Sequence, residues 1–174
     1  NLSEQQSKEG GDALPAGIGA SIASKKRAII ITGDGGLQMN IQELATAVHY
    51  KLPVTLIILN NGFLGNVRQW QQLFYDKRYA CTNLQPDESR VLTQEMIDNG
   101  EFEYVPDFVK LAESYGAKGM RVTKESDIAK SFKCADKHEE APTVLEFVIP
   151  TEINVLPMVP AGKSLSEMLL KDKD

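Results

Sequence analysis

The chain has 174 residues, of which 42% are hydrophobic and 25% are charged, and its formal net charge is −5. This length allows one domain with a hydrophobic core, and the composition is typical of soluble globular proteins. The acidic balance argues against nucleic acid as a partner, because nucleic-acid binding needs a basic face. The apolar runs are too short to cross a bilayer, so no membrane partner is expected either.

Cysteine and histidine are scarce. The cysteines are Cys81 and Cys134, so no disulfide framework is expected, and a reducing, cytoplasmic location is favoured. His49 and His138 show no paired spacing with them, which argues against a zinc site. Residue 1 is Asn rather than Met. The sequence could be a piece of a longer protein, and processing of the N-terminus would give the same observation.

The chain opens with a polar lead-in over residues 1–10. A small, apolar stretch follows at 14–24, where Pro15 suits the first turn of a helix. Two short apolar runs, at 27–33 and 53–61, are rich in β-branched residues and do not alternate with polar ones. They predict strands that are covered on both faces of a parallel sheet.

The segment between these two strands has a helical period. Apolar residues recur at i, i+3, i+4 and i+7, at Ile41, Leu44, Ala45 and Val48. Asn40 and Glu43 predict an N-cap with a capping-box partner. Residues 27–60 are therefore predicted to form one strand–helix–strand crossover.

The rest of the chain continues the alternation. A helix around Trp70 is predicted at 66–77, and the polar segment 82–103, without a sustained period, is interpreted as a surface excursion. Helical spacing resumes at Val105 and ends at Gly116. A strand, a helix and a buried strand are then predicted at 117–123, 124–137 and 143–149. This pattern predicts an α/β fold, with a mainly parallel sheet and helices on both faces, which is a three-layer α/β/α arrangement.

Glycine and amide residues follow both strands of the crossover, as Gly33-Asp34-Gly35-Gly36 and as Asn60-Asn61-Gly62. The carboxyl ends of parallel strands meet at one edge of the sheet, where ligands bind. Glycines let the backbone approach a bulky anion such as a diphosphate. Asp34 would repel a bare phosphate, so its presence suggests a divalent cation such as Mg²⁺, with an oxygen ligand from the Asn61 side chain.

Each of these junctions has a simpler explanation, because Gly-Asp-Gly and Asn-Asn-Gly are also ordinary turns. The pair is more informative, since 24 residues, the length of one crossover, separate Gly35 from Asn60. No Gly-Lys-Ser/Thr follows, so the pattern is not a P-loop, and "GDGGLQ" lacks the last glycine of a dinucleotide fingerprint.

GDG followed after one crossover by NN resembles the thiamine diphosphate-binding motif. The longer string from Ile31 to Tyr75, "ITGDGGLQMN…RQWQQLFY", is similar to the C-terminal cofactor domain of the acetolactate (acetohydroxyacid) synthase large subunit. "LPAGIGA" and "VLPMVPAGKS" resemble the same family. The resemblance covers residues 11–80 and 104–165, and it implies the thiamine diphosphate-binding fold over 11–150, followed by a C-terminal arm at 151–174.

The resemblance also implies a ligand set. Mg²⁺ would be held by the side chains of Asp34 and Asn61 and by the main-chain carbonyl of Phe63. The residues implied to bind the cofactor are Gly33, Asp34, Gly35, Gly36, Asn61, Phe63, Leu64, Gly65 and Asn66. Trp70 falls where the family has a tryptophan that shapes the second-substrate pocket, although a core aromatic on its helix is the alternative. The arm would fold over the active site, and the alternative is packing on the sheet.

The sequence departs from the family in two respects. Gly10 stands where the family has the methionine that bends the cofactor, although Gly11 keeps the glycine that follows. The family's catalytic glutamate lies in an N-terminal pyrimidine-binding domain, of the same or a second subunit, and a middle domain often carries FAD. Neither domain fits in 174 residues. No catalytic residue is therefore assigned to this chain, it is not expected to bind FAD, and it is expected to be inactive alone.

The function implied by the resemblance is that of a homo-oligomeric parent enzyme in branched-chain amino acid biosynthesis. It would join two pyruvates to form 2-acetolactate and CO₂, with 2-oxobutyrate as an alternative second substrate. Another thiamine diphosphate enzyme, such as a pyruvate oxidase or a 2-oxoacid decarboxylase, is one alternative, and Trp70 and "VLPMVPAG" argue against it. A non-catalytic module that binds a partner subunit is the other alternative.

Overall fold

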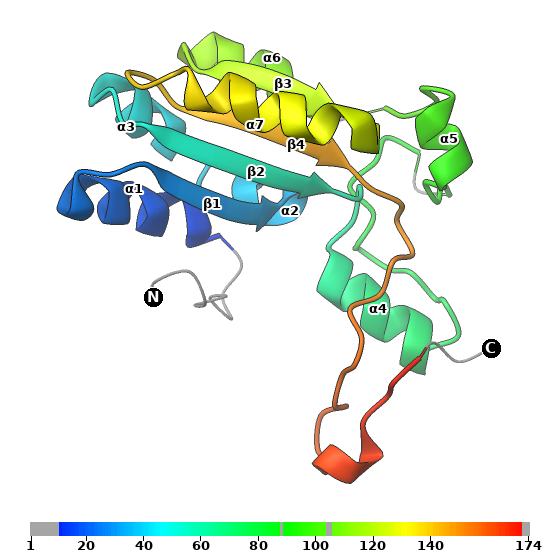
Figure 1. Cartoon of the computed structure of the whole chain (residues 1–174). Coiled ribbons are helices and arrows are strands. Elements are labelled where there is room, and N and C mark those ends of the chain that lie inside the picture. Colours follow the sequence, from blue (N-terminus) through cyan, green and yellow to red (C-terminus); the bar gives the residue numbers. More distant parts are fainter. Residues whose placement is uncertain (1–10, 88, 104–105, 172–174) are drawn as a thin grey trace.

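The computed structural model describes residues 11–87, 89–103 and 106–171. A sheet of four parallel strands runs through it in the order β1-β2-β4-β3 (Figure 1). The strands are β1 (Ala28–Gly33), β2 (Val54–Asn60), β3 (Lys118–Val122) and β4 (Thr143–Val148). All of them lie within a few residues of the predicted strands, so the expectation of a parallel α/β sheet is confirmed.

Helices cover both faces of the sheet, which confirms the three-layer α/β/α arrangement. The main core lies between the sheet and three helices, α1 (Ala13–Ser24), α3 (Glu43–His49) and α6 (Phe108–Tyr115). On the other face lies α7 (Ile128–Asp136), whose Phe132 contacts Phe147 of β4. The remaining helices are α2 (Asp34–Gln38), α4 (Gly65–Phe74), α5 (Gln94–Asp98) and the 3₁₀ turns η2 (Glu125–Asp127) and η3 (Leu165–Glu167).

The edge strand β1 is covered on one face only. Ile30 is 4% exposed and packs in the main core, but Ile29 and Ile31 point the other way and are each 61% exposed. The prediction that both faces are covered is right for β2 and wrong for β1, and β4 is buried as predicted. The reason is that α7 packs against β3 and β4, which lie toward the opposite edge of the sheet from β1.

The crossover helix α3 is present where it was predicted, but its start differs. The Asn40 amide donates to the carbonyl of Gly11 at 3.1 Å, and Glu43 accepts a bond from the Thr46 hydroxyl at 3.0 Å. The predicted capping box is therefore wrong, because both of its side chains have other partners. Within the helix, Leu44 is buried as expected, whereas Ala45 is exposed.

The segment 82–103 is more than a surface excursion. It contains α5, whose N-cap Thr93 accepts a bond from the Met96 N–H at 3.3 Å. Leu92 and Ile97 are buried in a second, smaller core with Val148 of β4. The helix α5 has only 5 residues, which is too few to show a helical period in the sequence, so the prediction missed this core.

Helix α6 ends as predicted, with Gly116 in the left-handed conformation at φ 88°. Its start was predicted from Val105, which lies outside the described residues, and the helix begins at Phe108 because Asp107 caps it. None of the helices in the described part of the chain is long and apolar enough to cross a membrane.

The helix α4 stands away from the sheet, together with the segment that follows β4 (Figure 1). Arg68 of α4 donates to the carbonyl of Ile153 and to the side chain of Asn154, at 3.2 and 2.7 Å. Gln69 exchanges two hydrogen bonds with the backbone of Val155. Residues 153–155 of the C-terminal arm therefore pack along α4.

Candidate functional site

The two glycine- and amide-rich junctions meet at one edge of the sheet. Strands β1 and β2 are parallel neighbours, and Gly33 pairs with Leu59, so the residues after each strand emerge side by side. Asp34 is 3% exposed, and the backbone N–H groups of Asn61 and Gly62 are near enough to lower the pKa of its carboxyl. The structure thus places the predicted carboxylate against the predicted asparagine turn.

The carboxyl group of Asp34 lies in an unusual electrostatic setting. Burial raises its pKa to about 7, although backbone N–H groups, including those of Asp34 and Gly35, act in the opposite direction. No cluster of three or more Asp, Glu, His or Cys side chains suited to a metal occurs among the described residues. A cation at this position would therefore draw on one carboxylate together with uncharged oxygen atoms, which suits Mg²⁺ bound to phosphates.

Side chains shape the turn that follows β2. The Asn60 side-chain oxygen accepts from the Gly62 N–H, and the Asn61 side-chain oxygen accepts from the Phe63 N–H, both at 3.0 Å. Gly62 has φ 70°, a left-handed conformation that favours glycine. In the described part of the chain, no group donates to the Phe63 carbonyl oxygen. The oxygen of Asn61 keeps a second lone pair and that of Phe63 keeps both, as metal ligands require.

Two of the predicted glycines allow the loops to pack against each other. A Cβ on Gly35 would lie 2.5 Å from the Leu64 side chain, and one on Gly65 would lie 2.9 Å from the Asn61 amide nitrogen. Gly33 differs, because the nearest atom to its Cβ position is 4.0 Å away and the residue is exposed. Among the predicted cofactor-binding glycines, Gly33 is therefore the one with open space next to its Cβ position. The role of Gly35 and Gly36 toward a diphosphate stays a prediction.

Helix α4 begins beside Asp34. Its N-cap is Leu64, which offers no side-chain hydrogen bond to the first turn. The N–H groups of the first turn, which Gly65 opens, consequently have no partner within the helix or from its cap, and they carry the positive end of the helix dipole. Gly65 and Asn66 carry N–H groups of this first turn, whereas the Leu64 N–H donates to the Thr82 carbonyl at 2.8 Å. The role of Leu64, Gly65 and Asn66 toward a diphosphate stays a prediction.

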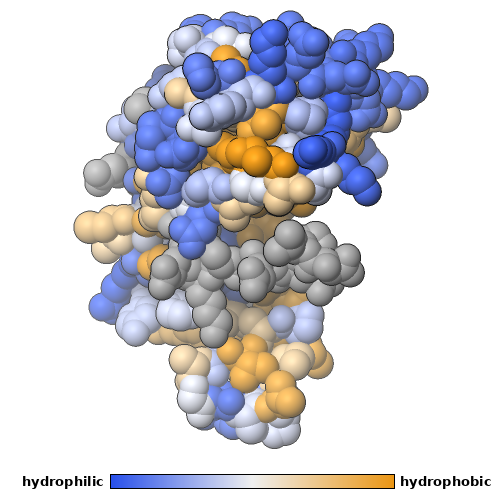
Figure 2. All heavy atoms as spheres, turned by 90° about the vertical axis from the view of Figure 1, so that its left-hand side faces the viewer, coloured by the Kyte–Doolittle hydropathy of each residue, from blue (hydrophilic) through white to orange (hydrophobic). Residues whose placement is uncertain are grey.

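Trp70 is not a core residue. It is 45% exposed, and it forms an apolar stripe along one side of α4 with Val67 and Phe74. Exposed Ile153 and Val155 belong to the arm that lies on α4. Figure 2 shows hydrophobic side chains at the surface of this lower part of the molecule. The geometry is compatible with a role of Trp70 in a pocket or interface, which stays a prediction.

Sequence reasoning missed the residues that support the asparagine turn. The hydroxyl of Thr151, which is fully buried, donates to the Asn61 carbonyl at 3.0 Å and accepts from the Leu92 N–H at 3.0 Å. Gln85 packs over Gly62, and with Glu103 it also lines a small pocket beside Asp34. The segment 82–103 therefore reaches the site. Gly10, at the methionine position of the family, lies outside the described residues.

Residues 7–147 match the family described as thiamine pyrophosphate enzyme, C-terminal TPP binding domain. The curated relatives include an acetolactate synthase large subunit of Cyanidium caldarium, 41% identical over 91% of this chain and 24% of the relative. Another from Corynebacterium glutamicum is 39% identical over 91% of this chain and 23% of the relative. The chain thus spans about a quarter of the length of the curated relatives it matches.

Solved structures of two decarboxylases are also similar. A thiamine diphosphate-dependent 4-hydroxybenzoylformate decarboxylase of Rhodococcus jostii RHA1 is 32% identical, with a TM-score of 0.61 over 77% of this chain and 22% of that one. A benzoylformate decarboxylase from Polynucleobacter necessarius is 21% identical, with a TM-score of 0.68 over 86% of this chain and 25% of that one. The second likeness shows the fold alone.

Proposed function

Because this chain belongs to the C-terminal TPP-binding domain family of thiamine pyrophosphate (thiamine diphosphate) enzymes, we propose that the loops after β1 and β2 bind the diphosphate of that cofactor together with Mg²⁺. The observation that carries the proposal is the position of Asp34. Its buried carboxyl faces the Asn61–Gly62 turn, and its pKa is raised to about 7 by a burial that a cation would offset.

The residues at this edge fit the group. Asp34 and the Asn61 side chain would be ligands of Mg²⁺, as would the carbonyl of Phe63, to which no described residue donates. Gly33 leaves space for the phosphates, and the first turn of α4 offers them N–H groups. When bound, thiamine diphosphate supplies the carbanion chemistry, and these residues anchor and orient it.

The relatives named acetolactate synthase are the basis for the rest of the proposal. The parent reaction would be the condensation of two pyruvates, or of pyruvate with 2-oxobutyrate, with loss of CO₂. Homo-oligomerisation and an N-terminal pyrimidine-binding domain, from the same or a second subunit, would complete the site. Any FAD would belong to the rest of the parent enzyme. The free cysteines Cys81 and Cys134 are the basis for placing the chain in the cytoplasm.

Three described glutamates could be considered as the catalytic acid, but each has a structural role or an exposed position. Glu43 accepts a bond from Thr46 within α3, and Glu146 is buried in a network away from solvent. Glu103 is exposed at the rim of the small pocket. The chain alone is therefore proposed to bind the cofactor without turning over pyruvate, because the proton transfers need a carboxylate near the pyrimidine ring.

The test is calorimetry of the chain with thiamine diphosphate, with and without Mg²⁺. The unmodified chain, called the parent below, is expected to bind thiamine diphosphate only with Mg²⁺, and Asp34→Ala is expected to abolish this Mg²⁺-dependent binding while the fold is kept. Asp136→Ala, which removes an exposed carboxylate at the end of α7, is the matched control and is expected to bind like the parent. Equal binding by the Asp34 variant and the parent would refute the metal assignment.

A further inference from the structure

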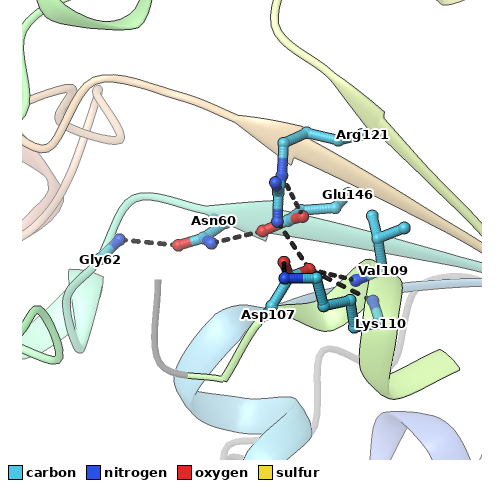
Figure 3. A network of polar contacts seen from close by, with 7 residues as sticks. All are labelled: Asn60, Gly62, Asp107, Val109, Lys110, Arg121 and Glu146. Carbon is cyan, nitrogen blue, oxygen red and sulfur yellow. Dashed lines mark hydrogen bonds and ion pairs between the residues drawn. The ribbon is translucent and has the colours of Figure 1, made fainter. Parts of the chain in front are cut away.

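A chain of buried and half-buried polar side chains connects the asparagine turn to the centre of the sheet and to the start of α6 (Figure 3). Asn60 is 3% exposed and Glu146, on β4, is 0% exposed. The Asn60 amide group donates to Glu146 Oε1 at 2.8 Å, and Arg121 Nε donates to Glu146 Oε2 at 2.8 Å. Arg121 also donates to Asp107, the N-cap of α6, at 2.9 Å.

The carboxylate of Glu146 sets the direction of the hydrogen bonds that the Asn60 amide makes. A carboxylate accepts and does not donate, so it holds the NH₂ group of Asn60 toward itself. The oxygen of the same amide then faces the other way and accepts the Gly62 N–H at 3.0 Å. Gly62 is the residue after Asn61, and its N–H also lies against Asp34. The orientation of one buried amide is thus transmitted to the turn between Asn61 and Phe63, two of the three predicted metal ligands.

We propose that Glu146 is a positioning residue for the metal and diphosphate loop, and that it acts by orienting the Asn60 amide so that the turn carrying Asn61 keeps its shape. This inference rests on the proposed function for the identity of the ligand, but the part about the turn does not depend on it. Mutation of a residue that hydrogen-bonds to a metal ligand and orients it typically lowers metal affinity by about 10- to 100-fold.

The donor and acceptor pattern makes a sharp test. In Glu146→Gln, the new NH₂ group must face either Arg121 or Asn60, so two donors meet somewhere in the network. In Asn60→Asp, two carboxylates face each other. In the double variant, the carboxylate introduced at position 60 accepts from the Gly62 N–H and from the NH₂ group introduced at position 146. The oxygen of that introduced amide accepts from Arg121, so every bond has a donor and an acceptor again. Thr143→Val, at a buried β4 hydroxyl without a partner among the described residues, is the control.

Two measurements separate this inference from the proposed function. Amide exchange at Gly62 needs no cofactor, and it is expected to speed up in each single variant and to return toward the parent rate in the double variant. Affinity for Mg²⁺ with thiamine diphosphate is expected to fall about 10- to 100-fold in each single variant, and to recover within about threefold of the parent in the double variant. The control is expected to match the parent in both measurements.

If the parent does not bind the cofactor, the proposed function fails, and the exchange data alone decide the inference about the turn. If the parent binds and Glu146→Gln binds and exchanges as the parent does, the inference is wrong. If the single variants do not fold, a folded double variant with parent-like exchange at Gly62 supports the inference. A double variant that is unfolded, or that is no better than the single ones, overturns it.

Discussion

The hydroxyl of Thr151 donates a hydrogen bond to the main-chain carbonyl of Asn61 across 90 positions of sequence, at a distance of 3.0 Å. Thr151 also exchanges hydrogen bonds with the backbone of Leu92 in the segment 82–103. The buried residue Thr151 therefore joins the asparagine turn to the segment 82–103, just beyond the end of β4. The site depends on residues far from its two motifs in sequence.

Replacing Thr151 with Val is expected to lower the free energy of unfolding by about 1–3 kcal/mol, because the buried Leu92 N–H loses its partner and the Asn61 carbonyl loses its donor. Chemical denaturation measures the change. Thr151→Ser keeps the hydroxyl and is the control, with a smaller expected loss. A valine variant as stable as the parent would show that water replaces the hydroxyl without cost.

Two glycines of α1 are expected to respond in opposite directions to replacement with alanine. A Cβ on Gly17 would lie 2.2 Å from Ile30 of β1, whereas nothing lies within 4 Å of a Cβ on Gly19. Gly17→Ala is therefore expected to lose about 1–3 kcal/mol of stability by overpacking. Gly19→Ala is expected to gain about 0.5–1 kcal/mol, because glycine is a poor helix former. Thermal unfolding of the pair measures both effects, and equal shifts would contradict the packing of α1 on β1.

Lowering the pH is expected to weaken the contacts that Glu152 of the arm makes with Lys77 and Tyr79. Glu152 accepts bonds from the Tyr79 hydroxyl at 2.5 Å and from Lys77 at 3.0 Å. Partial burial acts to raise the pKa of Glu152, but these two partners outweigh it and the pKa is lowered from its usual value of 4.5. The stability that Glu152 contributes is thus present above its unfolded pKa, and it is lost as the pH falls through the lower folded pKa.

Unfolding experiments from about pH 6 down to about pH 3 are expected to show this loss in the parent. Glu152→Gln cannot titrate, so its stability is expected to change less over that range. Tyr79→Phe removes one of the two partners and is expected to show an intermediate slope. If the free energy of unfolding changes equally with pH in all three proteins, this contact makes no contribution to the pH dependence.

The apolar stripe of α4 is expected to make the isolated chain self-associate, because contiguous exposed apolar patches mark interaction surfaces. Sedimentation velocity at increasing concentration measures this. Val67→Lys, within the stripe, is expected to reduce association, whereas Ile31→Lys, on the open face of β1, is expected to have less effect. A chain that stays monomeric at high concentration would contradict the expectation, and the reverse ranking would place the contact on β1.

The sequence predicts the crossover well because its strands and helix bury continuous apolar runs, whose period is visible locally. The meeting of Asp34 with the Asn61 turn was also predictable, because adjacent parallel strands end at the same edge. The Glu146 network was not predictable in the same way. A single glutamate in an apolar strand shows that something must satisfy it, but its partners lie 86 and 25 positions away.

The errors of the sequence-based predictions have a common physical origin. Ile29 and Ile31 look like core residues, because the hydrophobicity of a strand does not reveal that α7 covers β3 and β4 but leaves β1 open. Asn40 looks like a helix cap because its competing acceptor, the Gly11 carbonyl, is 29 positions away. In each example a tertiary neighbour decides the outcome, and local pattern has no access to it.

The attachment of α4 to the arm has a consequence for how the molecule opens. Arg68 and Gln69 are buried, and both donate hydrogen bonds to the backbone of the arm, at Ile153 and Val155. Local unfolding of the arm would therefore break these bonds to α4, which would remain tied to Ala80 and Thr82 through Gln71, while the four strands keep their own core. The half of the site that comes from β1 is then held by the sheet core alone, whereas the mobility of the half that leads into α4 depends on whether the arm is folded.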